Sequence, residues 1–199
     1  MRQATDEVAT LRPALKEWAV ICRALALGRQ AILLRKGGVA EPGGGFELAH
    51  RRFWLYPTYV HQQRGGIRPE AEPLLEEVEA DRPPQGRVRL SHFADVRGVY
   101  DVRDLPSLLV LAPWHVWSEE TVRSRFAYRR PGLYVVAVQV WRVPHPYEVP
   151  ERPEYAGCRS WLDLAEDLPT AGAQPVLGDD ALRELLRRLD TILNPTALA

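Results

Sequence analysis

Apolar residues near the start of the chain recur at intervals of three and four positions. Over residues 11–28 this spacing places them on one face of a helix, as in amphipathic helices that pack on a core. Pro13 suits the first turn of such a helix, and Gly28 suits its end. The apolar face consists of Leu15, Trp18, Ala19, Cys22 and Leu25 or Ala26. We therefore predict an N-terminal helix.

Runs of aliphatic, β-branched and aromatic residues then predict strands. The clearest is GLYVVAVQVWRV at 132–143, and the mostly apolar QAILLRK at 30–36 suits a central strand. Further strands are expected within 51–62, 87–102, 105–118 and near the end of the proline-rich segment 144–164.

The strand expected within 51–62 carries alternating aromatic side chains. Phe53 and Leu55 would face one side of a sheet, and Trp54 and Tyr56 the other. One set is expected in the core and the other partly exposed or in a cleft. Pro57 indicates a sheet edge or a bulge.

Three later segments predict helices. An acidic excursion at about 67–82 contains PEAEPLLEEVEAD, and Ser118 is a suitable N-cap for a helix through 130. An amphipathic C-terminal helix is expected at about 178–194. Its apolar stripe consists of Leu182, Leu185, Leu186, Leu189, Ile192 and Leu193.

This order of elements predicts an α+β fold. Strands dominate the middle of the chain without alternating strictly with helices, so we expect a small curled mixed β-sheet or β-barrel flanked by the N-terminal and C-terminal helices. The strands within 30–36, 51–59 and 133–141 should share that sheet. A length of 199 residues fits a single domain spanning residues 1–199.

Composition narrows the class of protein. No run of 18 or more apolar residues is present, and the N-terminus lacks the apolar region of a signal peptide, so no membrane association is expected. The two cysteines, Cys22 and Cys158, are far apart in sequence, which suits a cytoplasmic protein without a disulfide framework.

Charge is balanced overall but uneven along the chain. The formal net charge is zero, yet residues 1–66 carry ten Lys/Arg against five Asp/Glu, and residues 83–160 carry eleven against eight. The two acidic segments, 67–82 and 161–199, contain the predicted helices. A local cationic surface is therefore possible on a neutral protein, and acidic residues that simply solubilise helices explain the pattern equally well.

The candidate binding residues gather around the strands of 30–36 and 51–62. Arg35 and Lys36 precede two glycines, and Arg51 and Arg52 would lie across a hairpin from them. Cations bind phosphates, and aromatic rings stack on bases. The aromatic candidates are Tyr56, Tyr59 and His61. The alternative is that the four cations are solvated, that the tyrosines form a second core layer and that the glycine-rich stretch is a hairpin loop.

No catalytic or metal-binding motif is complete. The sequence contains no Glu-x-Lys and no Gly-x-Ser-x-Gly, and its glycine-rich stretch matches neither the phosphate-loop nor the dinucleotide pattern. No two histidines lie three to five positions apart, so we expect no metal and no cofactor. If the protein is an enzyme, Lys36, Glu47 and His61 are the catalytic candidates.

The chain also resembles two known families. The segments LLRKGG, FWLYPTYVHQ and APWHVW make it similar to a bacterial group, Domain of Unknown Function 1802. Members of that group are sometimes joined to a restriction-endonuclease-like region, which implies a role near DNA.

The second resemblance is to ASCH domains of the PUA-like superfamily. It rests on Gly-x-x-x-apolar-x-x-Arg from Gly28 to Arg35 after the expected helix, and on the segment 134–164. It implies a small β-barrel with flanking helices and, as ligand, RNA or a modified or flipped base. ASCH enzymes that remove acyl groups from modified cytidine carry a lysine and a threonine nucleophile where this chain has Gln30 and Leu33, so that activity is not implied.

Three functions remain open at this point. The first is a nucleic-acid-binding module, with RNA or DNA as partner and a possible link to restriction or nucleic-acid processing. The second is an enzyme that acts on a nucleotide or nucleic acid through a cleft of Lys36, Glu47 and His61. The third is a protein-interaction module that assembles through the C-terminal helix.

Overall fold

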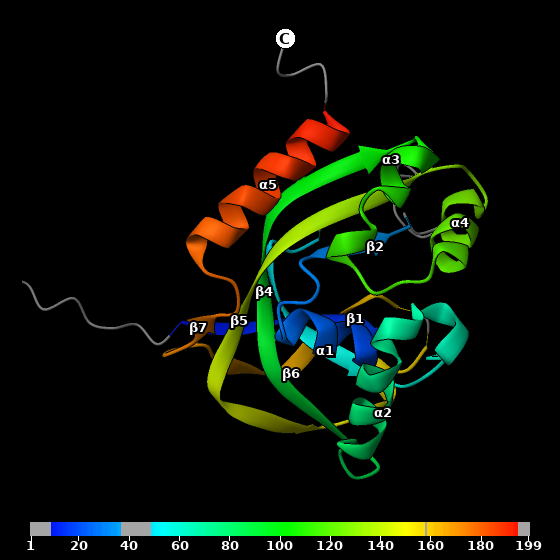
Figure 1. Cartoon of the computed structure of the whole chain (residues 1–199). Coiled ribbons are helices and arrows are strands. Elements are labelled where there is room, and N and C mark those ends of the chain that lie inside the picture. Colours follow the sequence, from blue (N-terminus) through cyan, green and yellow to red (C-terminus); the bar gives the residue numbers. More distant parts are fainter. Residues whose placement is uncertain (1–8, 37–48, 158, 195–199) are drawn as a thin grey trace, which may run out of the picture.

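The computed structural model describes residues 9–36, 49–157 and 159–194. It contains a seven-stranded sheet and five α-helices in those residues (Figure 1). The strands are β1 (Thr10–Trp18), β2 (Ile32–Arg35), β3 (Arg52–Thr58), β4 (Arg87–Val102), β5 (Leu133–Pro150), β6 (Trp161–Pro169) and β7 (Gln174–Pro175). The helices are α1 (Ala19–Ala26), α2 (Glu72–Ala80), α3 (Leu105–Leu109), α4 (Glu119–Ala127) and α5 (Asp179–Leu193).

The sheet is mixed and open. Its strand order is β2-β5-β4-β3-β1-β6, with β7 beside β5. The β1–β3 pair is parallel, and the other pairs are antiparallel. No hydrogen-bonded pairing among the described residues joins the edge strands β2 and β6, so the fold is the curled mixed sheet that the sequence predicted and not a closed barrel.

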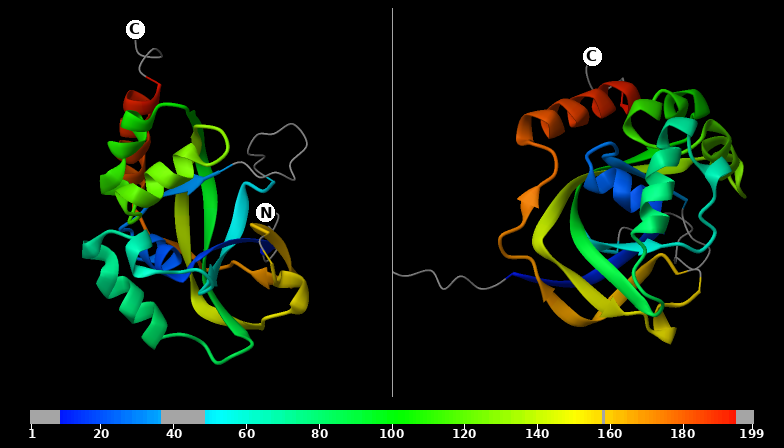
Figure 2. Two further views of the ribbon diagram at one scale, coloured as in Figure 1. Left: turned by 90° about the vertical axis from the view of Figure 1, so that its right-hand side faces the viewer. Right: turned by 60° about the horizontal axis from the view of Figure 1, so that its bottom comes forward.

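Long, bent strands curl this sheet. β4 and β5 pair from Arg87–Pro150 to Val102–Leu133, with register shifts between Leu90 and His92 and between Val96 and Gly98. Such bulges bend a strand and increase its twist. Figure 2 shows the resulting curvature of β4 and β5 along the molecule.

The first predicted helix is only half correct. Residues 10–18 form β1, which pairs with β3 and β6, and the helix begins at Ala19. The backbone N–H of Val20 donates to the side chain of Gln62 at 2.9 Å, which satisfies one of the free donors at the start of α1. Hydrogen bonding to two neighbouring strands outweighs the helical spacing of the apolar residues in this segment.

The strand expected within 105–118 is also wrong. The segment forms α3 and a 3-10 turn at Ala112–Trp114, and its β-structure is limited to a single bridge between Trp117 and Ile67. The remaining predicted elements are present, with two differences. β2 was expected to be a central strand and is an edge strand, and β5 continues through Pro150 into the segment expected to be a proline-rich crossing. β2, β3 and β5 share the sheet, and Ser118 caps α4 by accepting a hydrogen bond from Thr121 N at 3.2 Å.

Two apolar cores lie on the two faces of the sheet. Phe53 and Leu55 belong to the larger core, together with α1, whereas Trp54 and Tyr56 belong to the smaller one. All four residues are at most 2% exposed, so β3 is buried on both faces and neither set lies in a cleft.

The C-terminal helix packs on its own sheet. Leu182, Leu185 and Leu189 are buried in the larger core, and Tyr100 Oη donates to Asp190 at 2.8 Å. Figure 1 shows α5 alongside β4. None of the helices in the described part of the chain is long and apolar enough to cross a membrane.

Candidate functional site

The first predicted site residue, Arg35, forms a largely buried ion pair. Its Nη1 donates to Glu17 Oε2 at 3.0 Å, and the two side chains are 13% and 5% exposed. Its Nη2 donates to Ser160 Oγ at 2.5 Å. The other oxygen of Glu17 accepts a hydrogen bond from Trp18 N at 3.0 Å. Side chains thus connect the edge strand β2 to β1 and to the residue before β6.

A second guanidinium, that of Arg125 on α4, lies close to this ion pair. It stacks on the ring of Trp117 at 3.8 Å, and its Nη1 donates to Leu34 O at 3.4 Å. Burial lowers the pKa of Arg125, the negative charge of Glu17 raises it, and the positive charge of Arg35 lowers it further. We refer to Glu17, Arg35, Arg125 and Ser160 as the Arg35–Arg125 cluster. Two guanidinium groups in this cluster face one carboxylate.

Lys36 closes the turn after α4. Its Nζ donates to the carbonyl oxygens of Phe126 and Gly132, each at 2.9 Å, and to that of Arg130. Cations near a helix C-terminus stabilise the helix dipole, and this amine also fills carbonyl acceptors there. Burial lowers its pKa, as do the charges of Arg103 and Arg130.

Arg52 has a different partner from Arg35 and Lys36. Arg52 forms a bidentate ion pair with Asp95, at 2.6 and 2.9 Å. Its guanidinium lies over the ring of Phe93. The hydrogen bond to Asp95 raises its pKa. Arg51 is exposed.

The predicted aromatic residues occupy three different environments. Tyr56 is 2% exposed and packs against Tyr155, and burial raises its pKa. Tyr59 is partly exposed, with Arg82 stacked 4.4 Å from its ring centre. His61 is exposed and has a positive φ of 64°. Glu47 lies outside the described residues.

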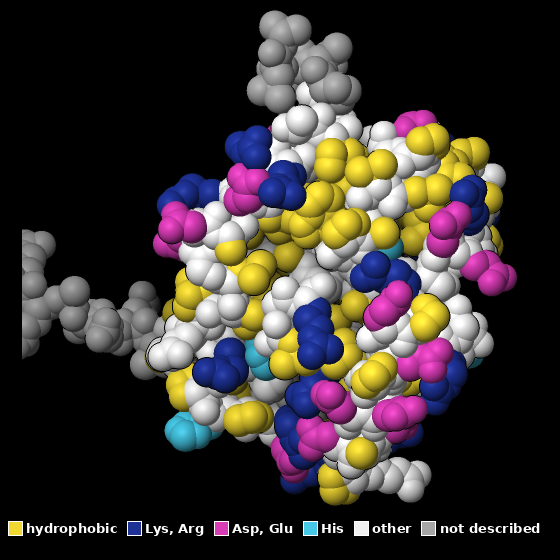
Figure 3. Space-filling model, in the orientation of Figure 1, with side chains coloured by type: hydrophobic (Ala, Val, Ile, Leu, Met, Phe, Trp, Pro, Cys, Tyr) yellow, Lys and Arg dark blue, Asp and Glu magenta, His cyan; other side chains and the backbone are white. Residues whose placement is uncertain are grey.

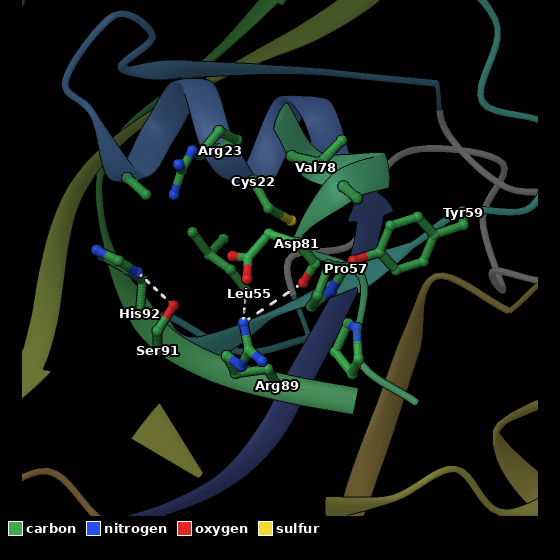
Figure 4. A pocket seen from close by; sticks show the side chains of 13 residues that line it. Cys22, Arg23, Leu55, Pro57, Tyr59, Val78, Asp81, Arg89, Ser91 and His92 are labelled. Atoms are coloured by element: carbon green, nitrogen blue, oxygen red, sulfur yellow. Dashed lines mark hydrogen bonds and ion pairs between the residues drawn. The ribbon is translucent and has the colours of Figure 1, made fainter. Parts of the chain in front are cut away.

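A small pocket, which the sequence did not indicate, opens between α1, the end of α2, β3 and β4 (Figure 4). Its volume is about 100 Å³. Ser91 Oγ and His92 Nδ1 share a hydrogen bond of 2.8 Å on its wall, and Arg23 points toward them. Burial lowers the pKa of His92 to about 4, with a further contribution from nearby arginines, so its ring is neutral at pH 7.

The charged side chains that line the pocket are in ion pairs, and its one described cysteine is unreactive. Arg89 bonds to Asp81 at 2.8 Å, and Arg23 to Glu77 at 3.1 Å. Cys22 is a buried free thiol whose pKa is raised by burial and by Glu17, so it is a poor nucleophile. Figure 3 shows cationic and acidic side chains interspersed over this face, without one dominant sign of charge.

Metal binding has no support in the described residues. They contain no group of three His, Cys, Asp or Glu side chains that could hold a metal ion.

Sequence reasoning missed three members of the Arg35–Arg125 cluster. Glu17 lies in a segment predicted to be helical, and Arg125 and Ser160 lie 90 and 125 residues from Arg35 in sequence. One signal was present: Glu17 is one of only five acidic residues among the first 66, which carry ten cations.

The fold defines an α+β protein with an open, curled sheet, and the Arg35–Arg125 cluster includes Arg35 on its edge strand β2. The chain belongs to the family described as domain of unknown function (DUF1802), whose family model matches residues 14–188. No curated protein matches the chain.

Among solved structures, the chain is similar to the ASCH protein of Zymomonas mobilis. The identity is 13%, the match covers 88% of this chain and 93% of the other, and the TM-score is 0.44. A mutant of the same protein gives 12% identity, coverages of 88% and 94%, and a TM-score of 0.45. ASCH domains are the second group that the sequence resembles.

Proposed function

We propose that this protein is a nucleic-acid-binding module that holds a phosphate-bearing strand at the edge of β2. The supporting observation is the charge balance of the Arg35–Arg125 cluster. Among the described residues, Glu17 is the acidic residue that acts on both guanidinium groups, so within that part of the chain this largely buried site carries an excess positive charge. A buried charge is costly unless it is paired, and a phosphate would supply the missing partner.

Further cations lie near Lys36, which follows Arg35 in the chain. The charges of Arg103 and Arg130 both act on the Lys36 amine. Lys16 donates its Nζ to Gly157 O at 3.1 Å, and its backbone N to Ser160 O at 2.8 Å. Asp101 pairs with Arg103 at 2.7 Å and compensates part of this positive charge. Phosphate contacts of this kind supply most of the affinity of proteins for nucleic acids.

Aromatic side chains next to the cluster provide a surface for bases. Trp161 follows Ser160, is partly exposed and contacts the ring of His50 at 5.4 Å. Stacking on such rings suits single strands, whose bases are accessible. Tyr59, in contrast, borders the pocket of Figure 4.

A salt titration tests this proposal. Binding of a single-stranded RNA, the matching single-stranded DNA and a duplex is measured by fluorescence anisotropy from about 50 to 200 mM salt. We expect binding of a single strand with a clear salt dependence, and a slope reduced by about 0.7 in Arg125→Met, the share of one phosphate contact. Arg187→Met, at an exposed ion pair on α5, is the control and should behave like the parent. Failure of the parent to bind any of the three at about 50 mM salt would contradict the proposal.

A second candidate, an enzyme acting on a nucleotide, is supported by the Ser91–His92 hydrogen bond inside a pocket. A neutral imidazole that accepts a hydroxyl proton is the arrangement used for nucleophilic catalysis. Lys36, Glu47 and His61 stay an untested prediction. We favour the Ser91–His92 pair, because the Lys36 amine already donates to carbonyl groups. Turnover of nucleotides or RNA that persists unchanged in Ser91→Ala and His92→Gln would exclude these two residues.

Assembly through α5 has less support than the other two functions. Burial of Leu182, Leu185 and Leu189 in the core of the same chain leaves this stripe unavailable to a partner.

A further inference from the structure

The hydrogen bonds of the Arg35–Arg125 cluster divide unequally between its two arginines. Glu17 uses one oxygen for Trp18 N and the other for Arg35. Arg35 also donates to Ser160 Oγ. Both oxygens of Glu17 are thus occupied, and Arg35 uses two of its five N–H donors.

Arg125 has the most donor capacity left over among the described residues of the cluster. A guanidinium has five N–H donors, and the hydrogen bond from Arg125 to Leu34 O is a long one, at 3.4 Å. One of its faces is covered by Trp117 at 3.8 Å, so the edge of the group carries its remaining interactions. The side chain is only partly exposed, so water is a limited substitute for a bound acceptor.

We propose that Arg125, with the Ser160 hydroxyl and the outer edge of Arg35, binds a phosphate monoester. This inference rests on the proposed function and specifies which part of the nucleic acid enters the cluster. A phosphate monoester carries three acceptor oxygens and close to two negative charges near neutral pH, which suits a forked guanidinium with unfilled donors.

The position of the cluster favours a strand end over an internal phosphate. Glu17 and Arg35 are 5% and 13% exposed, so only a small part of the cluster is accessible to a ligand. An internal phosphodiester has continuing chain on both sides and two bridging oxygens, and it therefore offers fewer acceptors to a group of limited accessibility. A terminal phosphate enters without carrying chain beyond it.

The same chemistry could come from a free nucleotide, and the experiment separates the two sources. A single-stranded oligonucleotide of fixed sequence is prepared with a 5′-phosphate, with a 3′-phosphate and with hydroxyl groups at both ends. Anisotropy at one salt concentration gives the three affinities. Inorganic phosphate and a nucleoside monophosphate are tested separately by the shift they cause in the melting temperature.

Two substitutions and a control on the same helix complete the design. Arg125→Met keeps an unbranched apolar side chain near Trp117 and removes the guanidinium group. Arg125→Lys keeps the positive charge but not the guanidinium donors. Arg123→Met, two residues earlier on α4 at an exposed pair with Glu119, is the control. Circular dichroism and melting curves of all variants verify folding.

We expect a phosphorylated end to strengthen binding by about tenfold, the scale of hydrogen bonds to charged groups. Arg125→Met should abolish this preference, Arg125→Lys should retain part of it, and Arg123→Met should keep it. Equal affinities for phosphorylated and hydroxyl ends in the parent, together with no shift in melting temperature from either small phosphate, would overturn the inference even if nucleic acid binds. If no oligonucleotide binds but a small phosphate stabilises the parent and not Arg125→Met, the phosphate site stands and the nucleic-acid function fails.

Discussion

Replacing Glu17 by Gln should destabilise the protein strongly, because it removes the carboxylate that pairs with Arg35 and whose charge also acts on Arg125. Glutamine has nearly the same shape and can still accept the hydrogen bond from Trp18 N, so the change isolates the charge. Breaking a buried ion pair by neutralising one partner costs about 3–5 kcal/mol, since the other charge is left buried without compensation. Both partners fit that case, at 5% and 13% exposure.

The effect is measurable by urea unfolding followed through tryptophan fluorescence. For a chain of this size each kcal/mol corresponds to about 2–4 °C, so the melting temperature should fall by about 6–20 °C. The dependence of unfolding free energy on urea should keep its slope, because the folded and unfolded surfaces do not change.

A control variant and a double variant test whether the unpaired charge causes the loss of stability. Glu119→Gln breaks the exposed pair with Arg123 and should have little effect, as is usual for surface pairs. Adding Arg35→Met to Glu17→Gln should recover part of the lost stability, because one unpaired guanidinium is removed. A loss below about 1 kcal/mol in Glu17→Gln, or no recovery in the double variant, would show that the buried charges are compensated in another way.

Three other outcomes follow from burial in the two cores and can be checked by denaturation. Leu185→Asp should cost about 2–5 kcal/mol, because Leu185 is 5% exposed in the larger core, and unchanged melting would contradict its position. Tyr56→Phe should leave stability unchanged or increase it, since the buried Tyr56 hydroxyl has no hydrogen-bond partner among the described residues, whereas a clear loss would reveal a partner. Burial lowers the pKa of His115 to about 4 from an ordinary value near 6.5, so the unfolded chain binds the extra proton between those values and stability should decrease as pH falls from about 6.5 to 4. That decrease should be smaller in His115→Gln, and an identical pH profile would argue against a neutral buried imidazole.

Local sequence patterns predicted those helices and strands whose own residues strongly favour that structure. β5 begins with a run of Val-rich, mostly buried residues, and α5 carries leucines at helical spacing. The local sequence is sufficient to predict a strand and a helix at these positions, and both are present.

β1 was missed because its partners lie far away in the sequence. Ala14, Leu15, Lys16 and Glu17 favour helices, and their spacing agrees with that preference. In the fold, however, Ala14 pairs with both Trp54 and Leu162, so two distant strands provide the hydrogen bonds that override local preference.

The residues of the candidate site also fall into those that local sequence predicts and those that depend on the fold. Arg35 and Lys36 were predicted from their position at a strand end beside glycines, whereas the residues that bind them could not be. Glu17 faces Arg35 only because residue 17 is in a strand, and Arg125 reaches the cluster only through the placement of α4. Prediction of these contacts required the topology of the sheet.

The pairing of β1 with β6 also restricts when the protein can finish folding during synthesis. These strands are separated by about 150 residues, and at ~5–20 residues per second the ribosome needs about 8–30 s to produce the second after the first. During that time one edge of β1 has unpaired N–H and C=O groups, the kind of edge that pairs with other chains. Contacts of such long sequence separation also slow folding after release. Newly made chains that stop before residue 161 should therefore be more prone to aggregate than complete ones, independently of how stable the finished sheet is.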